Sequence, residues 1–265
     1  MLLYLSHAKG GKIMIKTRGL TKAYGSKKVV DDISITLPKN KLIAFVGSNG
    51  AGKSTLLSLI GRTLDRSGGD CYIDEKEVKE WNSRDLAKRL SILSQTNHLN
   101  IRLTVHELVQ FGRFPYSQGR LTKEDEKKVE EAISYMGIDA FKERYLDELS
   151  GGQRQMAYIA MLLAQDTEYV FLDEPLNNLD MKHSVQIMKI LTKMVKELGK
   201  TVMVVIHDIN FVSCYADYII AMKDGKIVAN GPSEEVMNPQ TLKKVFGMEI
   251  KVEEIGGNNI CLYYT

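Results

Sequence analysis

The chain has 265 residues, of which 44% are hydrophobic and 26% are charged, the proportions of an ordinary globular protein rather than of a disordered or fibrous one. Its 36 basic and 33 acidic residues leave a net charge of +3, which is too small to predict nucleic-acid binding by itself. The longest apolar runs, such as Val202 to Ile206, fall far short of the ~20 residues that a membrane-spanning helix requires.

The cysteine pattern and the N-terminal residues indicate the cellular compartment in which the protein is expected. Cys71, Cys214 and Cys261 lack CxxC or Cys/His ligand spacing, which favours reduced thiols and gives no zinc motif. Residues 1–13 contain a brief apolar stretch, but not the long apolar region and small-residue cleavage site of a signal peptide. We therefore expect an N-terminal tail or extension on a cytoplasmic protein.

The first half of the chain begins with strand signals and then becomes helical. A helix is predicted from Lys53 to about Leu64, with Gly68 and Gly69 ending it. Thr104 with Glu107 has the sequence of a capping box for a helix at 105–111, and Thr122 with Asp125 begins a second, charged helix. The strands expected in this half are 13–18, 28–37, 42–46, 71–73 and 90–93.

From residue 150 onward, helices alternate with short apolar strands, a βαβ pattern that predicts a parallel sheet. The expected helices are 150–164 and 181–198, and the expected strands are 169–172, 202–206, 218–222, 226–230 and a final pair flanking 256–259. The fold class is α/β: a mixed, mainly parallel core sheet with an antiparallel β edge layer and a helical insertion at about 96–165.

A phosphate-binding motif lies between the strand 42–46 and the helix that follows it. The sequence GSNGAGKS at 47–54 matches GxxxxGK[ST] in full, in the strand-to-helix context that the motif requires. Its glycines let backbone N–H groups curl around an anion, Lys53 adds a cation, and the Ser54 hydroxyl can bind Mg²⁺. The candidate nucleotide-binding residues are Gly47, Ser48, Asn49, Gly50, Ala51, Gly52, Lys53, Ser54 and Thr55.

Two carboxylates, Asp173 and Glu174, follow the apolar strand 169–172, at the end of a strand where ligands gather in open α/β sheets. Asp173 suits a metal ion, and Glu174 suits a base that polarises a water in line with a γ-phosphate. Paired acids at strand ends are often only solvated loop residues. The phosphate-binding motif upstream favours the catalytic interpretation.

A second glycine-rich helix start reads LSGGQ at 149–153 and opens the helix 150–164. Ser150, Gly151 and Gly152 have the composition of another anion-binding helix N-terminus. One active site does not need two such ends for one γ-phosphate, whereas a head-to-tail dimer does.

Together these motifs resemble the nucleotide-binding subunit of an ATP-binding cassette (ABC) transporter over about residues 14–245. The resemblance implies that Tyr24 stacks on adenine, that Gln95 links Mg²⁺, the attacking water and the membrane subunit, and that His207 contacts the γ-phosphate. It also implies that Asp180 meets the opposite subunit and that residues 150–153, ending at Gln153, close on the ATP held by that subunit. The motifs that carry it are GSNGAGKST at 47–55, LSGGQ at 149–153, FLDEP at 171–175, NLD at 178–180 and His207 after a buried strand.

Each implied role has a plainer alternative. Tyr24 could be a half-buried tyrosine at a strand end, Gln95 a solvated loop amide, and His207 a core histidine. The other histidines have neither metal-ligand spacing nor an apposed carboxylate or cysteine set in the sequence, so structural or surface roles are expected for them. They are His7, His98, His106 and His183.

Two short segments, VQFGRFPY at 109–116 and DEPLNNLD at 173–180, are similar to the branch that energises import of iron(III) siderophores such as ferrichrome, enterobactin or petrobactin. Importers of haem or cobalamin, and a soluble ABC ATPase of iron-sulfur cluster assembly, remain alternatives. The resemblance implies ATP and Mg²⁺ as cofactors and a location at the cytoplasmic face of the membrane, with residues 246–265 as a β hairpin of the same domain. The implied partners are a second cassette, an integral membrane permease and, indirectly, an extracytoplasmic substrate-binding protein, with no nucleic acid.

Overall fold

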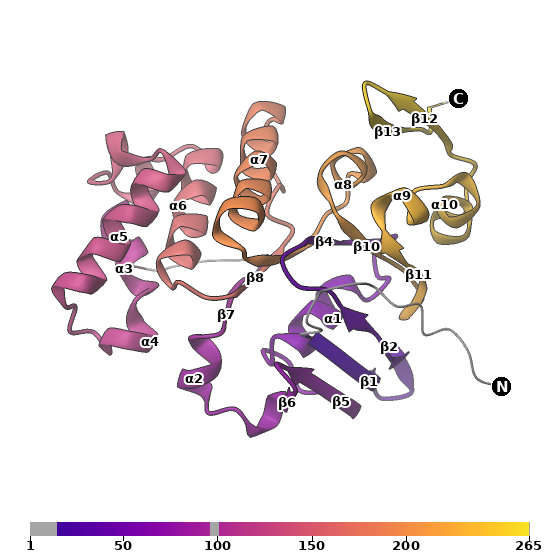
Figure 1. Cartoon of the computed structure of the whole chain (residues 1–265), viewed down its shortest axis with the longest axis horizontal. Helices are drawn as coiled ribbons and strands as arrows, with labels where there is room; N and C mark the ends of the chain where they lie inside the picture. The colour runs from indigo at the N-terminus through magenta and orange to yellow at the C-terminus, as the bar shows by residue number, and fades with distance from the viewer. Residues whose placement is uncertain (1–14, 96–100, 265) are drawn as a thin grey trace.

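The main sheet has the strand order β11-β10-β4-β9-β8-β7 in the computed structural model, which describes residues 15–95 and 101–264 (Figure 1). From β10 to β7 neighbouring strands run parallel, and β11 pairs antiparallel with β10 at one edge. The predicted N-terminal tail, residues 1–13, lies outside the described residues. The strands are β4 (Leu42–Val46), β7 (Leu90–Leu93), β8 (Tyr169–Asp173), β9 (Thr201–Val205), β10 (Tyr218–Lys223) and β11 (Lys226–Pro232).

This sheet separates two hydrophobic cores because successive side chains of a strand point to opposite faces. Ile43 and Phe45 of β4 pack in one core with α1 (Lys53–Ile60) and the antiparallel layer. Leu42 and Ala44 pack in the other with residues of α6, α7 (Met181–Leu198) and α8 (Ile209–Tyr215). Every residue of β4 and β9 is buried, which explains their continuous apolar sequence.

The predicted antiparallel layer is confirmed as a sheet of order β2-β1-β5-β6, with β3 paired to β1. The single strand expected at 28–37 is divided at residues 34–35, and the preceding part contains a left-handed residue, Asp32, with a φ of 54°. At the break the Thr17 hydroxyl donates to the Ile33 carbonyl (2.8 Å) and accepts from the Ile35 N–H (3.2 Å). The strands are β1 (Ile15–Tyr24), β2 (Lys27–Ile33), β3 (Thr36–Leu37), β5 (Gly68–Ile73) and β6 (Lys76–Glu77).

The helix predicted to continue to about Leu64 is shorter, since α1 ends at Ile60 and residues 68–69 begin β5. The predicted C-terminal end of this helix was wrong because contacts with residues elsewhere in the chain determine where it ends. Arg62 takes a left-handed φ of 56°, which ends the helix, and its guanidinium donates to the carbonyls of Val78 (3.0 Å) and Trp81 (2.6 Å).

Helices α3 to α6 form a helical layer at the left of Figure 1, and α3 and α5 pack on α6. The predicted capping box of Thr104 and Glu107 at α3 is confirmed, and the predicted helix start at Thr122 with Asp125 is also a capping box, at α5. The predicted insertion begins at residues 96–100, which lie outside the described residues. The helices are α3 (Val105–Phe111), α4 (Phe114–Ser117), α5 (Lys123–Met136) and α6 (Gly151–Ala164).

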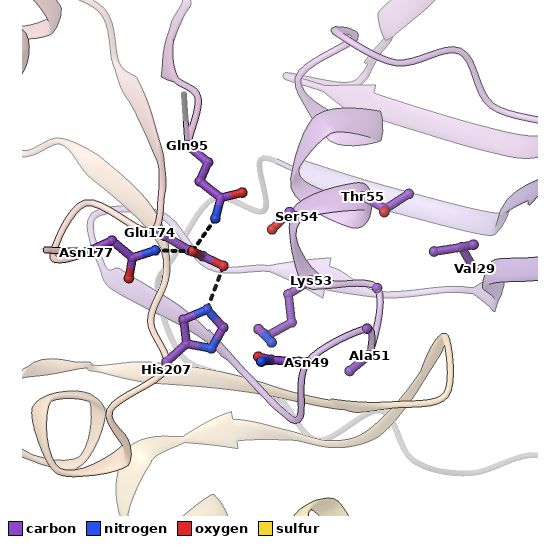
Figure 2. Close-up of a pocket in the computed structure, with 12 residues that line it drawn as sticks. Val29, Asn49, Ala51, Lys53, Ser54, Thr55, Gln95, Glu174, Asn177 and His207 are labelled. Atoms are coloured by element: carbon purple, nitrogen blue, oxygen red, sulfur yellow. Dashed lines mark hydrogen bonds and ion pairs between the residues drawn. The ribbon is translucent and has the colours of Figure 1, made fainter. Parts of the chain in front are cut away.

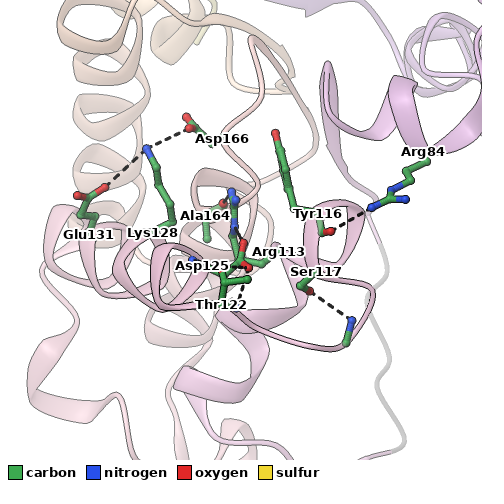
Figure 3. A network of polar contacts seen from close by, with 11 residues as sticks. Arg84, Arg113, Tyr116, Ser117, Thr122, Asp125, Lys128, Glu131, Ala164 and Asp166 are labelled. Atoms are coloured by element: carbon green, nitrogen blue, oxygen red, sulfur yellow. Dashed lines mark hydrogen bonds and ion pairs between the residues drawn. The ribbon is translucent and has the colours of Figure 1, made fainter.

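A buried ion pair holds this helical layer together (Figure 3). Arg113 donates through Nε to Oδ1 of Asp125 (2.9 Å) and through Nη1 to the Ala164 carbonyl at the end of α6 (2.8 Å). Burial alone would raise the pKa of Asp125, but hydrogen bonds from Thr122 and Arg113 outweigh it and hold that pKa below its usual range. One carboxylate therefore caps α5 and, through Arg113 at the start of α4, is connected to the end of α6.

Arg84 of α2 (Ser83–Ala87) connects the sheet region to the helical layer (Figure 3). Its guanidinium donates to the main-chain carbonyls of Pro115 (2.8 Å) and Tyr116 (3.1 Å) in α4. Gln165 makes a second connection by donating to the Ala87 carbonyl (2.6 Å). The helical layer is thus attached to α2 by side chains that bind backbone oxygens.

The C-terminal segment closes the fold with α9 (Ser233–Val236), α10 (Pro239–Phe246) and the hairpin of β12 (Lys251–Ile255) and β13 (Asn258–Leu262). The predicted final strand pair is confirmed, and the hairpin packs on α8, where the Asn210 side chain bonds both backbone groups of Cys261. Across residues 15–95 and 101–264, no helix is long and apolar enough to pass through a bilayer. Short 3₁₀ turns lie at Val78–Glu80, Asp139–Phe141 and Leu146–Glu148.

Candidate active site

The loop between β4 and α1 curls tightly because three of its glycines take positive φ. Gly47, Gly50 and Gly52 have φ of 147°, 78° and 97°. A Cβ atom on Gly47 would lie 2.2 Å from the Met222 carbonyl oxygen, and one on Gly52 would lie 2.4 Å from that of Val29. Any other residue at Gly47 or Gly52 would displace this loop.

The N-terminus of α1 has a distinctive lack of side-chain partners. Gly52 is its N-cap, no side-chain cap is present among the described residues, and the first turn contains no acidic residue. The N–H groups of a first helical turn have no partners within the helix, and they are partial positive charges that attract anions. This end of α1 therefore favours a phosphate.

Lys53 is buried beside the same loop. Its ammonium group donates to the carbonyls of Gly47 (2.8 Å) and Ser48 (3.0 Å). Burial lowers the pKa of Lys53, and the negative charges of Glu174 and Asp173 partly oppose that shift. The loop thus holds a cation at the helix end that favours an anion.

Ser54 and Asp173 place two oxygen ligands side by side. The Ser54 hydroxyl donates to Oδ1 of Asp173 (2.7 Å), and this bond joins the first turn of α1 to the end of β8. Burial raises the pKa of Asp173, while the Ser54 bond opposes that shift. The described residues contain no group of three or more His, Cys, Asp or Glu suited to a metal ion. One carboxylate and one hydroxyl suit Mg²⁺, which keeps waters and takes substrate phosphates as its other ligands.

Three side chains converge on the Glu174 carboxylate (Figure 2). Gln95 donates through Nε2 to Oε2 (2.7 Å), Nε2 of His207 lies 2.5 Å from Oε1, and Asn177 donates to Oε2. Glu174 also has a left-handed φ of 53°, which is rare for a non-glycine residue and aims its side chain. Both carboxylate oxygens are therefore fixed in direction.

Asn177 is a site residue that the sequence analysis did not identify. Its backbone N–H donates to the Glu174 carbonyl (3.2 Å), so the two residues are the ends of a turn. A turn brings residues i and i+3 close together. The spacing of three residues between Glu174 and Asn177 could therefore have predicted this contact, but only if a turn at 174–177 had been assumed.

A cavity of about 470 Å³ lies between these groups. Most of the predicted nucleotide-binding loop lines it, and so do all four predicted catalytic residues, which are Lys53, Gln95, Glu174 and His207. Gly47, Ser48 and Asp173 are absent from the lining but bond to Lys53 or Ser54, which line it. The lining residues are Val29, Asn49, Gly50, Ala51, Gly52, Lys53, Ser54, Thr55, Gln95, Glu174, Asn177 and His207.

The predicted residues of the second glycine-rich helix start do not line this cavity. Ser150 is the N-cap of α6, where its hydroxyl oxygen accepts from the Gln153 N–H (3.2 Å) and its own N–H donates to Oε1 of Gln153 (3.1 Å). Gly151 lies near the loop before α7, since a Cβ atom on it would be 3.8 Å from the Asn178 carbonyl oxygen. Asp180 caps α7, so residues 150–153 and Asp180 form a second group.

Tyr24 belongs to neither group. It ends β1, is 57% exposed and does not line the cavity, and the Lys22 ammonium lies 4.9 Å from its ring centroid. Its predicted contact with adenine stays a prediction.

Two of the remaining histidines have carboxylate partners, contrary to the sequence analysis. Nδ1 of His183 lies 2.9 Å from Asp180, and Nε2 of His106 lies 3.3 Å from Glu130. The first pair is one helical turn apart, but the second joins α3 to α5 and required the tertiary fold. His7 and His98 lie outside the described residues.

Known proteins resemble the chain closely. Residues 30–177 match the family model described as ABC transporter. The chain is 53% identical to the petrobactin import ATP-binding protein YclP of Bacillus subtilis, over 95% of this chain and 100% of that protein. It is 51% identical to the petrobactin import ATP-binding protein FatE of Bacillus anthracis, over 92% and 97%. Among solved structures, the dimeric post-hydrolysis state of the ATP-binding cassette MJ0796 bound to ADP and Pi is 30% identical, with a TM-score of 0.73 and coverage of 83% and 99%.

Proposed function

The chain belongs to the ABC transporter family and is an ATPase, and from this premise we propose that it energises the import of an iron-siderophore complex through a separate membrane permease. One observation carries the proposal: the identity of 53% to a petrobactin import ATP-binding protein extends over 95% of this chain. Petrobactin is accordingly the first cargo to test.

In the proposed mechanism the triphosphate of ATP binds at the N–H groups of the first turn of α1. Lys53 leaves the Gly47 and Ser48 carbonyls, or shares its donors with them, to neutralise the outer phosphates. Ser54 and Asp173 are the residues that would hold Mg²⁺, which would offset phosphate charge. Gln95 reaches the same region from the end of β7, and Tyr24 is the candidate platform for adenine.

Glu174 is the proposed general base. Its oxygens are engaged by Gln95, Asn177 and His207, so accepting a proton from water requires one oxygen to exchange a side-chain donor for that water. His207 lines the same cavity, and it is the proposed group that turns from Glu174 toward a γ-phosphate. The arrangement couples arrival of the substrate to release of the base.

The second group of residues caps α6 and α7 but does not line the cavity of its own copy, and this supports a dimer. The helix end at Ser150–Gly152 and the carboxylate of Asp180 are brought together away from the cavity lining. We propose that they complete the ATP site of a second, oppositely oriented cassette. The solved cassette that is 30% identical is dimeric. Attachment to a permease would place both copies at the cytoplasmic face of the membrane.

The test is transport in cells that lack this protein. The wild-type chain should restore uptake of ⁵⁵Fe-petrobactin and copurify from detergent-solubilised membranes with an integral permease. The Glu174→Gln variant should copurify equally but restore no uptake. Restoration of haem or cobalamin uptake in place of siderophore uptake would refute the cargo. Copurification with iron-sulfur scaffold proteins, and none with membranes, would refute import altogether.

A further inference from the structure

His183 lies in the contact between the first turns of α6 and α7. A Cβ atom on Gly152 would be 2.4 Å from Cγ and Cδ2 of His183 and 2.9 Å from its Nε2. The imidazole ring therefore lies directly on the backbone of α6, in a space that exists because residue 152 has no side chain. His183 and Gly152 are complementary in shape.

Asp180 holds the ring from the other side. Nδ1 of His183 lies 2.9 Å from both carboxylate oxygens of Asp180, so it donates to this carboxylate when it carries a proton. The side chain of His183 is 26% exposed and that of Asp180 is 64% exposed. The imidazole ring is thus partly buried, and it connects the exposed Asp180 carboxylate to the first turn of α6.

Capping of α7 does not explain the imidazole. The cap is the bond from the backbone N–H of His183 to Oδ1 of Asp180 (2.8 Å), which any residue at 183 except proline would make. The ring adds a second bond to the same carboxylate and the contact with Gly152. These additions fix the direction of the Asp180 side chain relative to the first turn of α6.

We infer that His183 is a positioning residue, which locks the loop 178–180 against the turn 150–153 so that both segments meet the nucleotide of a second copy as one rigid surface. This inference rests on the proposed sharing of ATP between two copies. Its physical basis is that a small displacement of groups at a reacting centre lowers the rate steeply, even when binding is retained. His183 does not line the cavity of its own copy.

The experiment compares His183→Ala with His183→Asn in the full chain. Asparagine places an amide Nδ2 near the position of the imidazole Nδ1, so it can still donate to Asp180. We expect His183→Ala to lower kcat for ATP by about tenfold or more, with the Kd of the isolated chain for nucleotide unchanged. His183→Asn should recover kcat to within about threefold of wild type. His106→Ala, a histidine that also pairs with a carboxylate but on α3, is the matched control and should keep wild-type kcat.

A second readout does not depend on hydrolysis. Hydrogen exchange of the nucleotide-free chain should speed up at both 150–154 and 178–183 in His183→Ala, and at neither in His106→Ala. Wild-type kcat in His183→Ala, or exchange unchanged at 150–154, would overturn the inference. If the wild-type chain neither hydrolyses ATP nor pairs with a second copy, the proposed function fails, while the exchange result still decides whether His183 joins the two segments.

Discussion

The first turns of α1 and α6 both begin with glycines, yet they are completed in different ways. At α1 the N-cap is Gly52 and no described side chain caps the helix. At α6 Ser150 and Gln153 cap one another through reciprocal bonds to backbone N–H groups. The first turn that lines the cavity therefore has no side-chain cap for its N–H groups, whereas the turn outside the cavity lining is partly satisfied before any ligand arrives.

A comparison with the other capped helices explains what α6 retains. The capping boxes of α3 and α5 use an acid at the third position, Glu107 and Asp125, whereas α6 uses the neutral Gln153. Neither α1 nor α6 has an acidic residue in its first turn. Because the Ser150 oxygen accepts from Gln153, its hydroxyl hydrogen is still able to donate outward. Both ends thus keep the positive potential that favours phosphate, but only α6 is capped as well.

The largest expected effect is on the rate of ATP hydrolysis, which a change at Glu174 should lower without weakening nucleotide binding at α1. Glu174→Gln should lower kcat by roughly 10²- to 10⁴-fold, because an amide accepts no proton, while nucleotide affinity stays close to wild type. Single-turnover hydrolysis and equilibrium binding measure the two quantities. Glu131→Gln, at an exposed carboxylate of α5, is the control. Equal turnover in Glu174→Gln and wild type would mean that another group is the base.

Replacing Asp125, an acidic helix cap that does not line the cavity, should have a large effect on the free energy of unfolding. Asp125→Asn leaves Arg113 buried without its charge partner and should cost about 3–5 kcal/mol in the free energy of unfolding. The pKa of Asp125 is lowered in the folded state, so its stabilisation is complete above the usual ~3.9 and is lost as pH falls through the lowered pKa. Denaturant titrations from pH 2 to pH 7 should therefore show a shallower acid limb in the variant. An unchanged free energy of unfolding at pH 7 would contradict this reading of the ion pair.

Adding an acid to α1 should make it resemble α3. Thr55→Glu places a carboxylate at the third position of the helix, which should stabilise the nucleotide-free protein by about 0.3–1 kcal/mol. The same charge should oppose phosphate by roughly 3 kcal/mol, about 100-fold in the Kd for ATP. Thermal unfolding with and without ATP measures both effects, and Thr55→Gln controls for size. A variant that binds ATP as tightly as wild type would show that the phosphates lie elsewhere.

The smallest expected effect tests whether α6 must remain neutral. Gln153→Glu keeps a capping box, so the melting temperature should change little. It should lower kcat by about tenfold, because a negative charge then faces the nucleotide of the second copy, while nucleotide affinity of the isolated chain is unchanged. Steady-state hydrolysis across a range of protein concentrations makes this measurement. Undiminished kcat at every concentration would argue that α6 meets no phosphate.

Local patterns predicted much of the fold and of the cavity. The bounds of β7 and α7 agree with the structure, because an apolar run and a long amphipathic period are local properties. The helices α8 and α10 were not predicted, since each is short and its apolar residues depend on distant partners for burial. The predicted end of α1 was misplaced for a related reason, because the left-handed Arg62 that follows Gly61 bonds to the carbonyls of residues 78 and 81.

The residues of the site likewise divide into those that the local sequence predicts and those that depend on contacts between distant segments. Loop 47–55 was predictable because its conformation depends on its own glycines, whereas the convergence of Gln95, Asn177 and His207 on Glu174 joins three separate segments. The pairing of His183 with Gly152 belongs to this second kind. Spacing in the sequence gives the residues of a single turn, but not the contacts between two turns.

The connection from Arg84 to α4 has a consequence for how such a protein diversifies. Both acceptors are main-chain carbonyls, at Pro115 and Tyr116, so they persist when neighbouring side chains change. Phe114 is largely exposed and takes no part in this connection. Substitution there can alter the outer surface of the helical layer without loosening its attachment. The outer surface of the helical layer and its attachment to α2 can therefore evolve independently.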